Sequence, residues 1–143
     1  MNKGTLLLLH VCYWLGAVID LVAGLIMVVP SFYGTVNKLT VFTPTQAFTN
    51  VAWMGAPLMF GWTVLLLWAD RKPLERRAVL LITLIPILGN ALNQVASYSS
   101  GFYPLEVAIQ QWLLQAFLVI LFVIGYWQAA KLSRIEEAAG KDK

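Results

Sequence analysis

The sequence predicts an all-α membrane protein, a bundle of four transmembrane helices with both termini in the cytoplasm. Three observations predict this fold. The chain of 143 residues is 59% hydrophobic and only 12% charged, whereas soluble domains carry roughly 25% charged residues. The few charged residues divide the chain into four long apolar stretches. The basic residues gather at alternate ends of these stretches, which predicts an orientation.

Each apolar stretch is long enough to cross a bilayer, which takes about 20 helical residues. The predicted spans lie near residues 5–30, 49–69, 78–98 and 105–130. The first span is too long for a signal peptide and contains Asp20, so we expect it to remain in the membrane. Residues 1–132 therefore form one transmembrane domain, and residues 133–143 form a charged cytoplasmic tail that extends the last helix briefly.

The loops between the spans predict the orientation. Nine of the ten basic residues fall on one side: Lys3, the loop 70–77 and the residues after the fourth span, from Lys131 onward. Only Lys38 lies on the other side. Because basic loops stay inside, both termini are expected in the cytoplasm. The longest connection, 31–48, is then extracytoplasmic. It either covers the bundle as a lid, with a short strand or hairpin over 36–42, or forms an irregular surface loop.

Asp20 is the most informative polar residue of the spans. An ionised carboxylate at membrane depth costs roughly 3 kcal/mol, so it is expected to face the interior of the bundle. The small residues around it share one helical face at spacings of three and four. They are Gly16, Ala17, Ala23 and Gly24. Because small residues let a neighbouring helix approach closely, this face predicts a tight helix contact with one acid in it.

Amide side chains form further polar patches at membrane depth. The third span has a polar stripe of Thr83, Pro86, Asn90, Asn93 and Ser97, with Gln94 beside it. The fourth span has Gln111 and Gln115 on one face. At about 1.5 Å of rise per residue, the amides of these two spans and Asp20 reach similar depths in the outer half of the membrane. They predict one polar pocket. Alternatively, the amides only hold helices together, at roughly 0.6 kcal/mol each.

Several function classes are disfavoured. There is one cysteine, Cys12, and one histidine, His10, so neither a disulfide framework nor a multi-ligand metal site is expected. His10 is interpreted as a hydrogen-bond partner between helices. No Ser-His-Asp set or glycine-rich phosphate loop occurs, and no cofactor is expected. The net charge of +3 comes from helix ends and does not indicate nucleic-acid binding.

The stretch FGWTVLLLWADRKPLERR, Phe60–Arg77, and the YWLGAVIDLVAG region of the first span resemble a family of small, functionally uncharacterised four-span prokaryotic membrane proteins. This resemblance implies a prokaryotic cytoplasmic membrane. Asp20 and the LIPIL run, Leu84–Leu88, are more weakly similar to the sterol isomerase and sigma-2 receptor superfamily, although a second early acid is missing. Gly16, Ala17 and Asp20 are vaguely similar to the small multidrug-resistance exporters, whose weak charge bias this chain lacks.

Three functions remain open from the sequence. In the first, Asp20 is a counter-ion or a catalytic acid/base in a pocket for a lipophilic or cationic small molecule or a lipid, because a carboxyl group in such surroundings suits proton transfer. Asn90, Asn93, Gln94, Gln111 and Gln115 then orient the ligand. In the second, Asp20 drives proton-coupled transport. In the third, the protein is an accessory subunit. Membrane lipids are the expected partners, and the sequence also allows a homo-oligomer.

Overall fold

The computed structural model describes residues 3–39 and 41–141, and it places side chains up to Ile135. The described chain is mostly helical, with turns and short irregular connections and without strands. Its helices are α1 (Lys3–Val28), α2 (Pro30–Val36), α3 (Gln46–Asp70), α4 (Ala78–Ser99) and α5 (Leu105–Lys141). Four of them, all but α2, are long and apolar enough to cross a membrane. The predicted all-α fold of four membrane-spanning helices is therefore confirmed.

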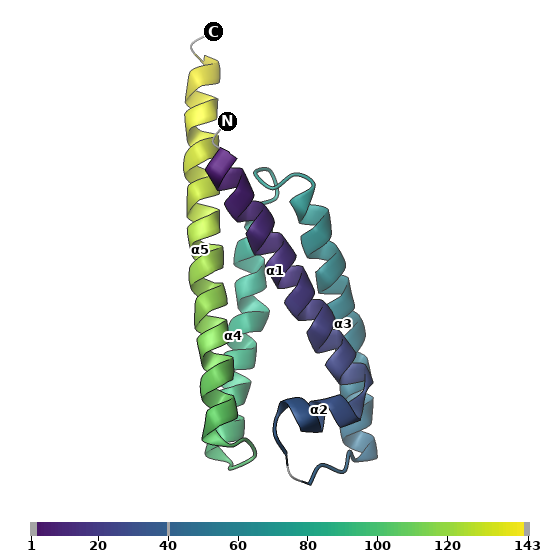
Figure 1. Cartoon of the computed structure of the whole chain (residues 1–143). Coiled ribbons are helices and arrows are strands. Elements are labelled where there is room, and N and C mark those ends of the chain that lie inside the picture. The colour runs from purple at the N-terminus through teal and green to yellow at the C-terminus, as the bar shows by residue number, and fades with distance from the viewer. Residues whose placement is uncertain (1–2, 40, 142–143) are drawn as a thin grey trace.

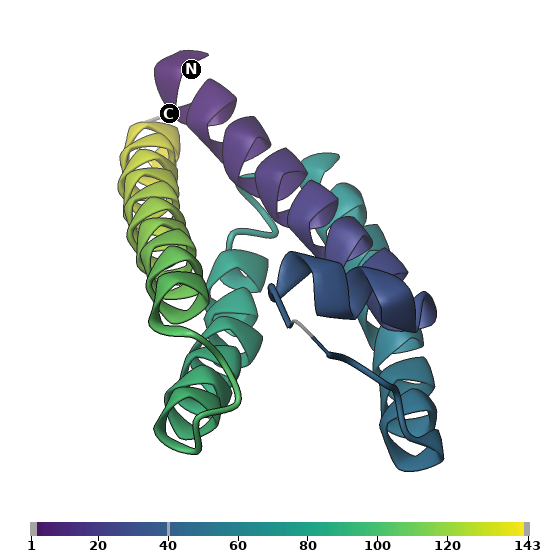
Figure 2. The ribbon, with the colours of Figure 1, turned by 60° about the horizontal axis from the view of Figure 1, so that its bottom comes forward.

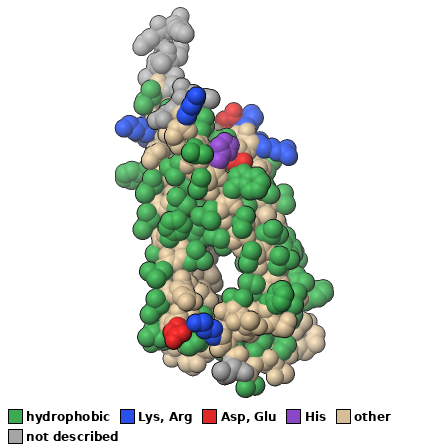
Figure 3. All heavy atoms as spheres, viewed as in Figure 1, with side chains coloured by type: hydrophobic (Ala, Val, Ile, Leu, Met, Phe, Trp, Pro, Cys, Tyr) green, Lys and Arg blue, Asp and Glu red, His purple; other side chains and the backbone are tan. Residues whose placement is uncertain are grey.

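The four long helices form two pairs that diverge from a common end (Figure 1). Helix α1 packs mainly on α3, and α4 packs mainly on α5, while α1 also contacts α5. The pairs meet where the α3–α4 loop lies, and both termini are at this same end (Figure 1). At the opposite end the pairs are splayed apart, and α2 lies there (Figure 2). The two helix pairs therefore form a wedge, and the space-filling view shows an opening between them (Figure 3).

The closed end of the wedge contains the best-packed core. Its largest fully buried side chains are Tyr13, Phe122, Leu9, Leu66, Leu80 and Cys12. Glycines allow this convergence: a Cβ atom on Gly125 would lie 2.9 Å from the Cys12 sulfur, and one on Gly16 would lie 3.0 Å from Phe122 Cζ. Helices α1, α4 and α5 can meet closely here because these two positions carry no side chain.

The small-residue face of α1 packs as the sequence indicates. Gly16, Ala17 and Gly24 are buried in the structure. A Cβ on Gly24 would lie only 2.5 Å from the Phe60 ring of α3. The Thr63 hydroxyl of α3 lies 3.4 Å from the backbone carbonyl oxygen of Ala17. This face therefore makes the α1–α3 pair, which is one wall of the opening.

The connection after α1 differs from the sequence-based expectation, because it contains helix α2 and the described residues form no strand. Val29 has extended backbone angles (φ −114°, ψ 91°), and Pro30 begins α2. Proline suits the first turn of a helix, where its missing N–H is not needed. The predicted strand or hairpin over 36–42 is thus wrong for its described residues, and Thr40 lies outside them. Tyr33, Phe42 and Phe48 form an aromatic cluster with ring centroids 4.9–5.3 Å apart.

The remaining helix ends have local causes. Thr45 caps α3 by accepting a hydrogen bond from the Phe48 amide at 3.2 Å, which satisfies a free backbone donor. The Pro104 carbonyl begins α5 by accepting from the Val107 and Ala108 amides. Helix α5 continues to Lys141, so the charged tail from residue 133 extends the last helix further than the brief extension expected from the sequence. Residues 142 and 143 lie outside the described part.

The face of the bundle seen in Figure 3 is apolar along most of its length. Large hydrophobic side chains are exposed on all four long helices, among them Leu7, Met54, Ile85 and Trp127. Such a surface is incompatible with water but matches hydrocarbon, where every backbone group of a helix is already paired. Basic side chains gather at the closed end of the wedge (Figure 3). These features agree with an integral, multi-pass membrane protein.

Candidate intramembrane site

The opening between the helix pairs is a cavity of about 550 Å³, which is within the usual range of small-molecule sites. All five helices or their flanking turns contribute to its walls. Its polar lining residues are Asp20, Tyr33, Asn37, Thr83, Asn90, Asn93, Gln94, Tyr103, Gln111 and Gln115. The rest of the lining is mostly aliphatic or aromatic, including Ile19, Val22, Trp62, Ile87 and Leu118.

The structure brings all six sequence-predicted site residues to this one cavity: Asp20, Asn90, Asn93, Gln94, Gln111 and Gln115. They come from three helices, because α1 supplies the acid, α4 supplies three amides and α5 supplies two. Thr83 and Pro86 of the same α4 stripe also line the cavity, whereas Ser97 does not. Asp20 is the only acidic or basic side chain among the described lining residues.

Three of the predicted site residues have a buried polar atom without a hydrogen-bond partner within the described chain. Asp20 Oδ2, Gln94 Oε1 and Gln115 Oε1 are buried atoms without a hydrogen-bond partner there. Gln94 is 4% exposed and Gln115 is 8% exposed, so bulk solvent does not reach these side chains freely. A buried polar atom left unpaired costs about 1–3 kcal/mol. The cavity therefore has unmet hydrogen-bonding capacity contributed by three different helices.

Gln111 is the exception among the predicted amides. Its Nε2 donates to Asn37 Oδ1 at 2.9 Å, and Asn37 Nδ2 in turn donates to the Tyr33 carbonyl at 2.8 Å. Asn37 is 4% exposed. Gln111 thus binds the turn after α2 and contributes to closing the splayed end.

Helix α2 and its following turn lie across this splayed end (Figure 2). Three side-chain contacts join them to α5 or the residues just before it. Besides the Asn37–Gln111 bond, the Tyr33 and Tyr103 hydroxyls pair, and Lys38 Nζ lies 3.1 Å from Glu106 Oε2. Burial and the bond to Tyr33 raise the pKa of Tyr103 above its ordinary value, so its hydroxyl stays neutral at physiological pH. We call residues 30–39 the cover segment.

Sequence reasoning missed three polar residues of the cavity, namely Tyr33, Asn37 and Tyr103. All three lie outside the predicted spans, where a search for polar residues at membrane depth does not reach. A signal was available for two of them. Tyr33 and Asn37 are four residues apart after Pro30, which is helix-compatible spacing that follows a favoured helix-starting residue.

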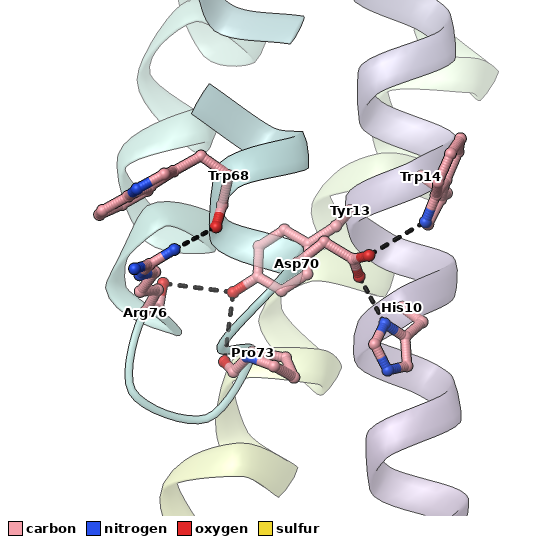
Figure 4. Close-up of polar contacts among 7 residues, drawn as sticks. All are labelled: His10, Tyr13, Trp14, Trp68, Asp70, Pro73 and Arg76. Carbon is pink, nitrogen blue, oxygen red and sulfur yellow. Dashed lines mark hydrogen bonds and ion pairs between the residues drawn. The ribbon is translucent and has the colours of Figure 1, made fainter. Parts of the chain in front are cut away.

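A second polar cluster ties α1 to the end of α3, outside the cavity (Figure 4). His10 Nδ1 lies 2.5 Å from Asp70 Oδ1, and Trp14 Nε1 donates to Asp70 Oδ2 at 3.1 Å. The Tyr13 hydroxyl lies 3.3 Å from the Pro73 carbonyl and 3.2 Å from that of Arg76. The interpretation of His10 as a hydrogen-bond partner between helices is confirmed. This cluster holds the α3–α4 loop at the closed end.

The protection of the backbone amides of the cover segment from hydrogen exchange is expected to depend on Asn37. In Asn37→Ala the Gln111 amide loses its acceptor, at a cost of about 1–2 kcal/mol, which corresponds to a factor of about 5–30 in an opening equilibrium. Hydrogen–deuterium exchange of the amides of Asn37, Lys38 and Leu39, which are hydrogen-bonded within this segment, should accelerate by that factor.

Lys38→Gln is the matched control for this experiment. The Lys38 and Glu106 side chains are 52% and 77% exposed, and exposed pairs contribute only about 0–1 kcal/mol. Exchange should therefore change little. Equal acceleration in the two variants would contradict the role assigned to the Asn37–Gln111 bond.

The chain matches no protein-family model, and no curated protein or solved structure is significantly similar to it.

Proposed function

We propose that this protein binds a lipophilic small molecule or lipid in its intramembrane cavity through Asp20. The observation that carries the proposal is the isolation of this acid. It is the only acidic or basic group among the described lining residues, and its Oδ2 is buried without a partner. Because a charged or polar group at membrane depth is costly unless paired, an unpaired one that lines a cavity indicates a bound partner.

The amide groups support the same proposal. Amides that serve only to hold helices together are expected to hydrogen-bond across helices, yet Gln94 and Gln115 each have a buried oxygen without a partner among the described residues. Asn90 and Asn93 line the cavity beside them. In the proposal these four side chains and Gln111 orient the ligand's polar part, and the apolar walls contact the remainder.

The proposed setting is a prokaryotic cytoplasmic membrane. Both termini and the basic α3–α4 loop lie at the closed end of the wedge (Figure 1), and the positive-inside rule assigns such an end to the cytoplasm. The cavity and cover segment are then in the outer half. The resemblance of Phe60–Arg77 to small prokaryotic four-span proteins supports this setting.

Covalent labelling by dicyclohexylcarbodiimide tests the proposal, because this apolar reagent modifies carboxyl groups that it can reach from the lipid phase. In vesicles of phosphatidylcholine we expect labelling at Asp20, mapped by mass spectrometry, and its loss in Asp20→Asn. At least one of decanol, decylamine and a sterol should slow the labelling in a saturable way.

Asp70 is an internal control, since it is a carboxylate at the closed end, paired with His10 and Trp14 and outside the cavity. Its modification should not respond to the added lipophilic compounds. If Asp20 is unmodified in the folded protein but modified after unfolding in detergent, the carboxyl group is sealed in a packed interior. The binding proposal would then be wrong.

A further inference from the structure

We infer that the ligand is a long-chain lipid that enters the cavity sideways from the bilayer, with a head group rich in O–H or N–H donors and free of negative charge. This inference rests on the proposed binding function and specifies its ligand. Three features of the described structure carry it: the lateral opening of the cavity, the chemistry of its unpaired atoms, and the position of the cover segment.

The cavity is open towards the lipid on the flanks of the bundle. Figure 3 shows an opening that passes between the two helix pairs, just above the end where α2 lies. Within the cavity wall, α3 and α4 are joined by a side-chain hydrogen bond from Trp62 Nε1 to Thr83 Oγ1 at 3.1 Å. In a bilayer an acyl chain can therefore enter between the pairs without unfolding any helix.

The apolar walls of this opening suit an extended chain. Ile19, Val22 and Ile26 of α1 face it together with Ile87 of α4 and Leu114 of α5. An unfilled gap between such side chains would lose dispersion contacts on both sides, and water would find few polar partners along these walls. A hydrocarbon chain from the surrounding membrane offers the matching surface.

The unpaired atoms specify the head group. Asp20 Oδ2, Gln94 Oε1 and Gln115 Oε1 are all oxygen acceptors, so they require donors from the ligand. No lysine, arginine or histidine is among the described lining residues. A phosphate or carboxylate head group would therefore find no positive partner and would be repelled by an ionised Asp20. Hydroxyl or amine groups without a negative charge fit this set.

The cover segment restricts the route from the aqueous side. Tyr33, Val36 and Asn37 line the cavity from this segment, and its three contacts with the α5 region connect the two helix pairs across their splayed end. A ligand that enters from the side, between the two helix pairs, breaks none of these contacts. This arrangement favours a ligand that arrives from within the membrane.

Three oleoyl compounds with the same chain test the inference in phosphatidylcholine vesicles. They are monoolein, which carries two hydroxyl groups, methyl oleate, which has no donor, and N-oleoyltaurine, whose sulfonate is anionic at neutral pH and does not react with the carbodiimide. The readout is protection of Asp20 from dicyclohexylcarbodiimide as a function of mole fraction. Monoolein should protect at a mole fraction at least about tenfold lower than either other compound, since losing one or two hydrogen bonds corresponds to about this factor.

Variants that fill the cavity, and a control variant outside it, provide a second test of the inference. Ala23→Trp and Ile87→Trp each place a large side chain at a lining position, and both should abolish the protection by monoolein. Ala116→Trp adds the same side chain at an exposed position of α5 that is not part of the lining, and it should leave protection unchanged. Using two blocking positions keeps the test decisive if one variant fails to fold.

The outcomes separate this inference from the proposed function. Equal protection by the three oleoyl compounds, or protection that survives both blocking variants, overturns the lipid assignment. Protection by decylamine or a sterol but not by monoolein overturns it as well, while leaving the binding function intact. A complete lack of Asp20 labelling in the folded protein instead removes the binding function itself.

Discussion

Gly24→Leu is expected to destabilise the bundle by about 1–3 kcal/mol, the usual cost of overpacking a well-packed site. Even a Cβ at this position would lie 2.5 Å from the Phe60 Cε1 atom and 2.8 Å from Cδ1, and leucine adds three more carbon atoms. Helices α1 and α3 would have to move apart, which changes one wall of the cavity. The measurement is the free energy of unfolding in mixed detergent and SDS micelles.

Gly61→Leu is the control within the same helix pair. Gly61 is an exposed α3 residue, and a Cβ on it would meet nothing within 4 Å. Because leucine is a better helix former than glycine, the free energy of unfolding should stay constant or rise by up to about 1 kcal/mol. A similar loss of stability in both variants would show that the small-residue face of α1 is not the packing contact described here.

Phe122→Ala is expected to produce the other large effect, a loss of about 3 kcal/mol in the free energy of unfolding. Phe122 is 0% exposed and is among the largest fully buried side chains. It lies close to Gly16 of α1, where α5 joins the other helix pair. Since the unfolded helices remain in lipid or detergent, little hydrophobic transfer energy is lost. The cost comes from the cavity left behind, which places it at the low end of the range for phenylalanine.

Phe117→Ala is the matched control on α5, because the Phe117 side chain is 53% exposed and faces outward. The same unfolding measurement should give a change below about 1 kcal/mol, as for surface substitutions in general. If Phe122→Ala were as mild as this control, the closed end would not hold the two helix pairs together. Contacts other than those of Phe122 would then have to hold the two helix pairs together.

The spans could be predicted because a bilayer imposes strong constraints on a sequence. Each span must be apolar over about 20 residues, so the charged residues between the apolar stretches were sufficient to mark the helices. Asp20 itself was identifiable because an acidic residue within an apolar span is energetically costly, and such residues usually have a functional role. The five predicted amides of α4 and α5 followed from helical spacing, and all five line the cavity with Asp20.

The parts that were not predictable depend on contacts between distant segments. The role of Asn37 is visible only when Gln111, 74 positions away, is placed beside it. From the sequence, Asp70 is a charged residue at the end of a predicted span. The structure adds that His10 and Trp14 donate hydrogen bonds to its two carboxylate oxygens. The splay of the helix pairs also has no local signature, because it depends on where glycines such as Gly16 and Gly125 allow close approach.

The sequence by itself determined four long apolar helices, the alternation of basic loops, and a small-residue face with one acid, because hydrophobicity and charge act residue by residue. Only the tertiary structure decided that the helices pair as α1 with α3 and α4 with α5, and that these pairs separate around a cavity. The physical reason is that helix packing within a membrane is governed by the fit of side chains across helices. This fit depends on side chains of different helices that lie far apart in the sequence. A local sequence pattern therefore does not reveal which helices will pair.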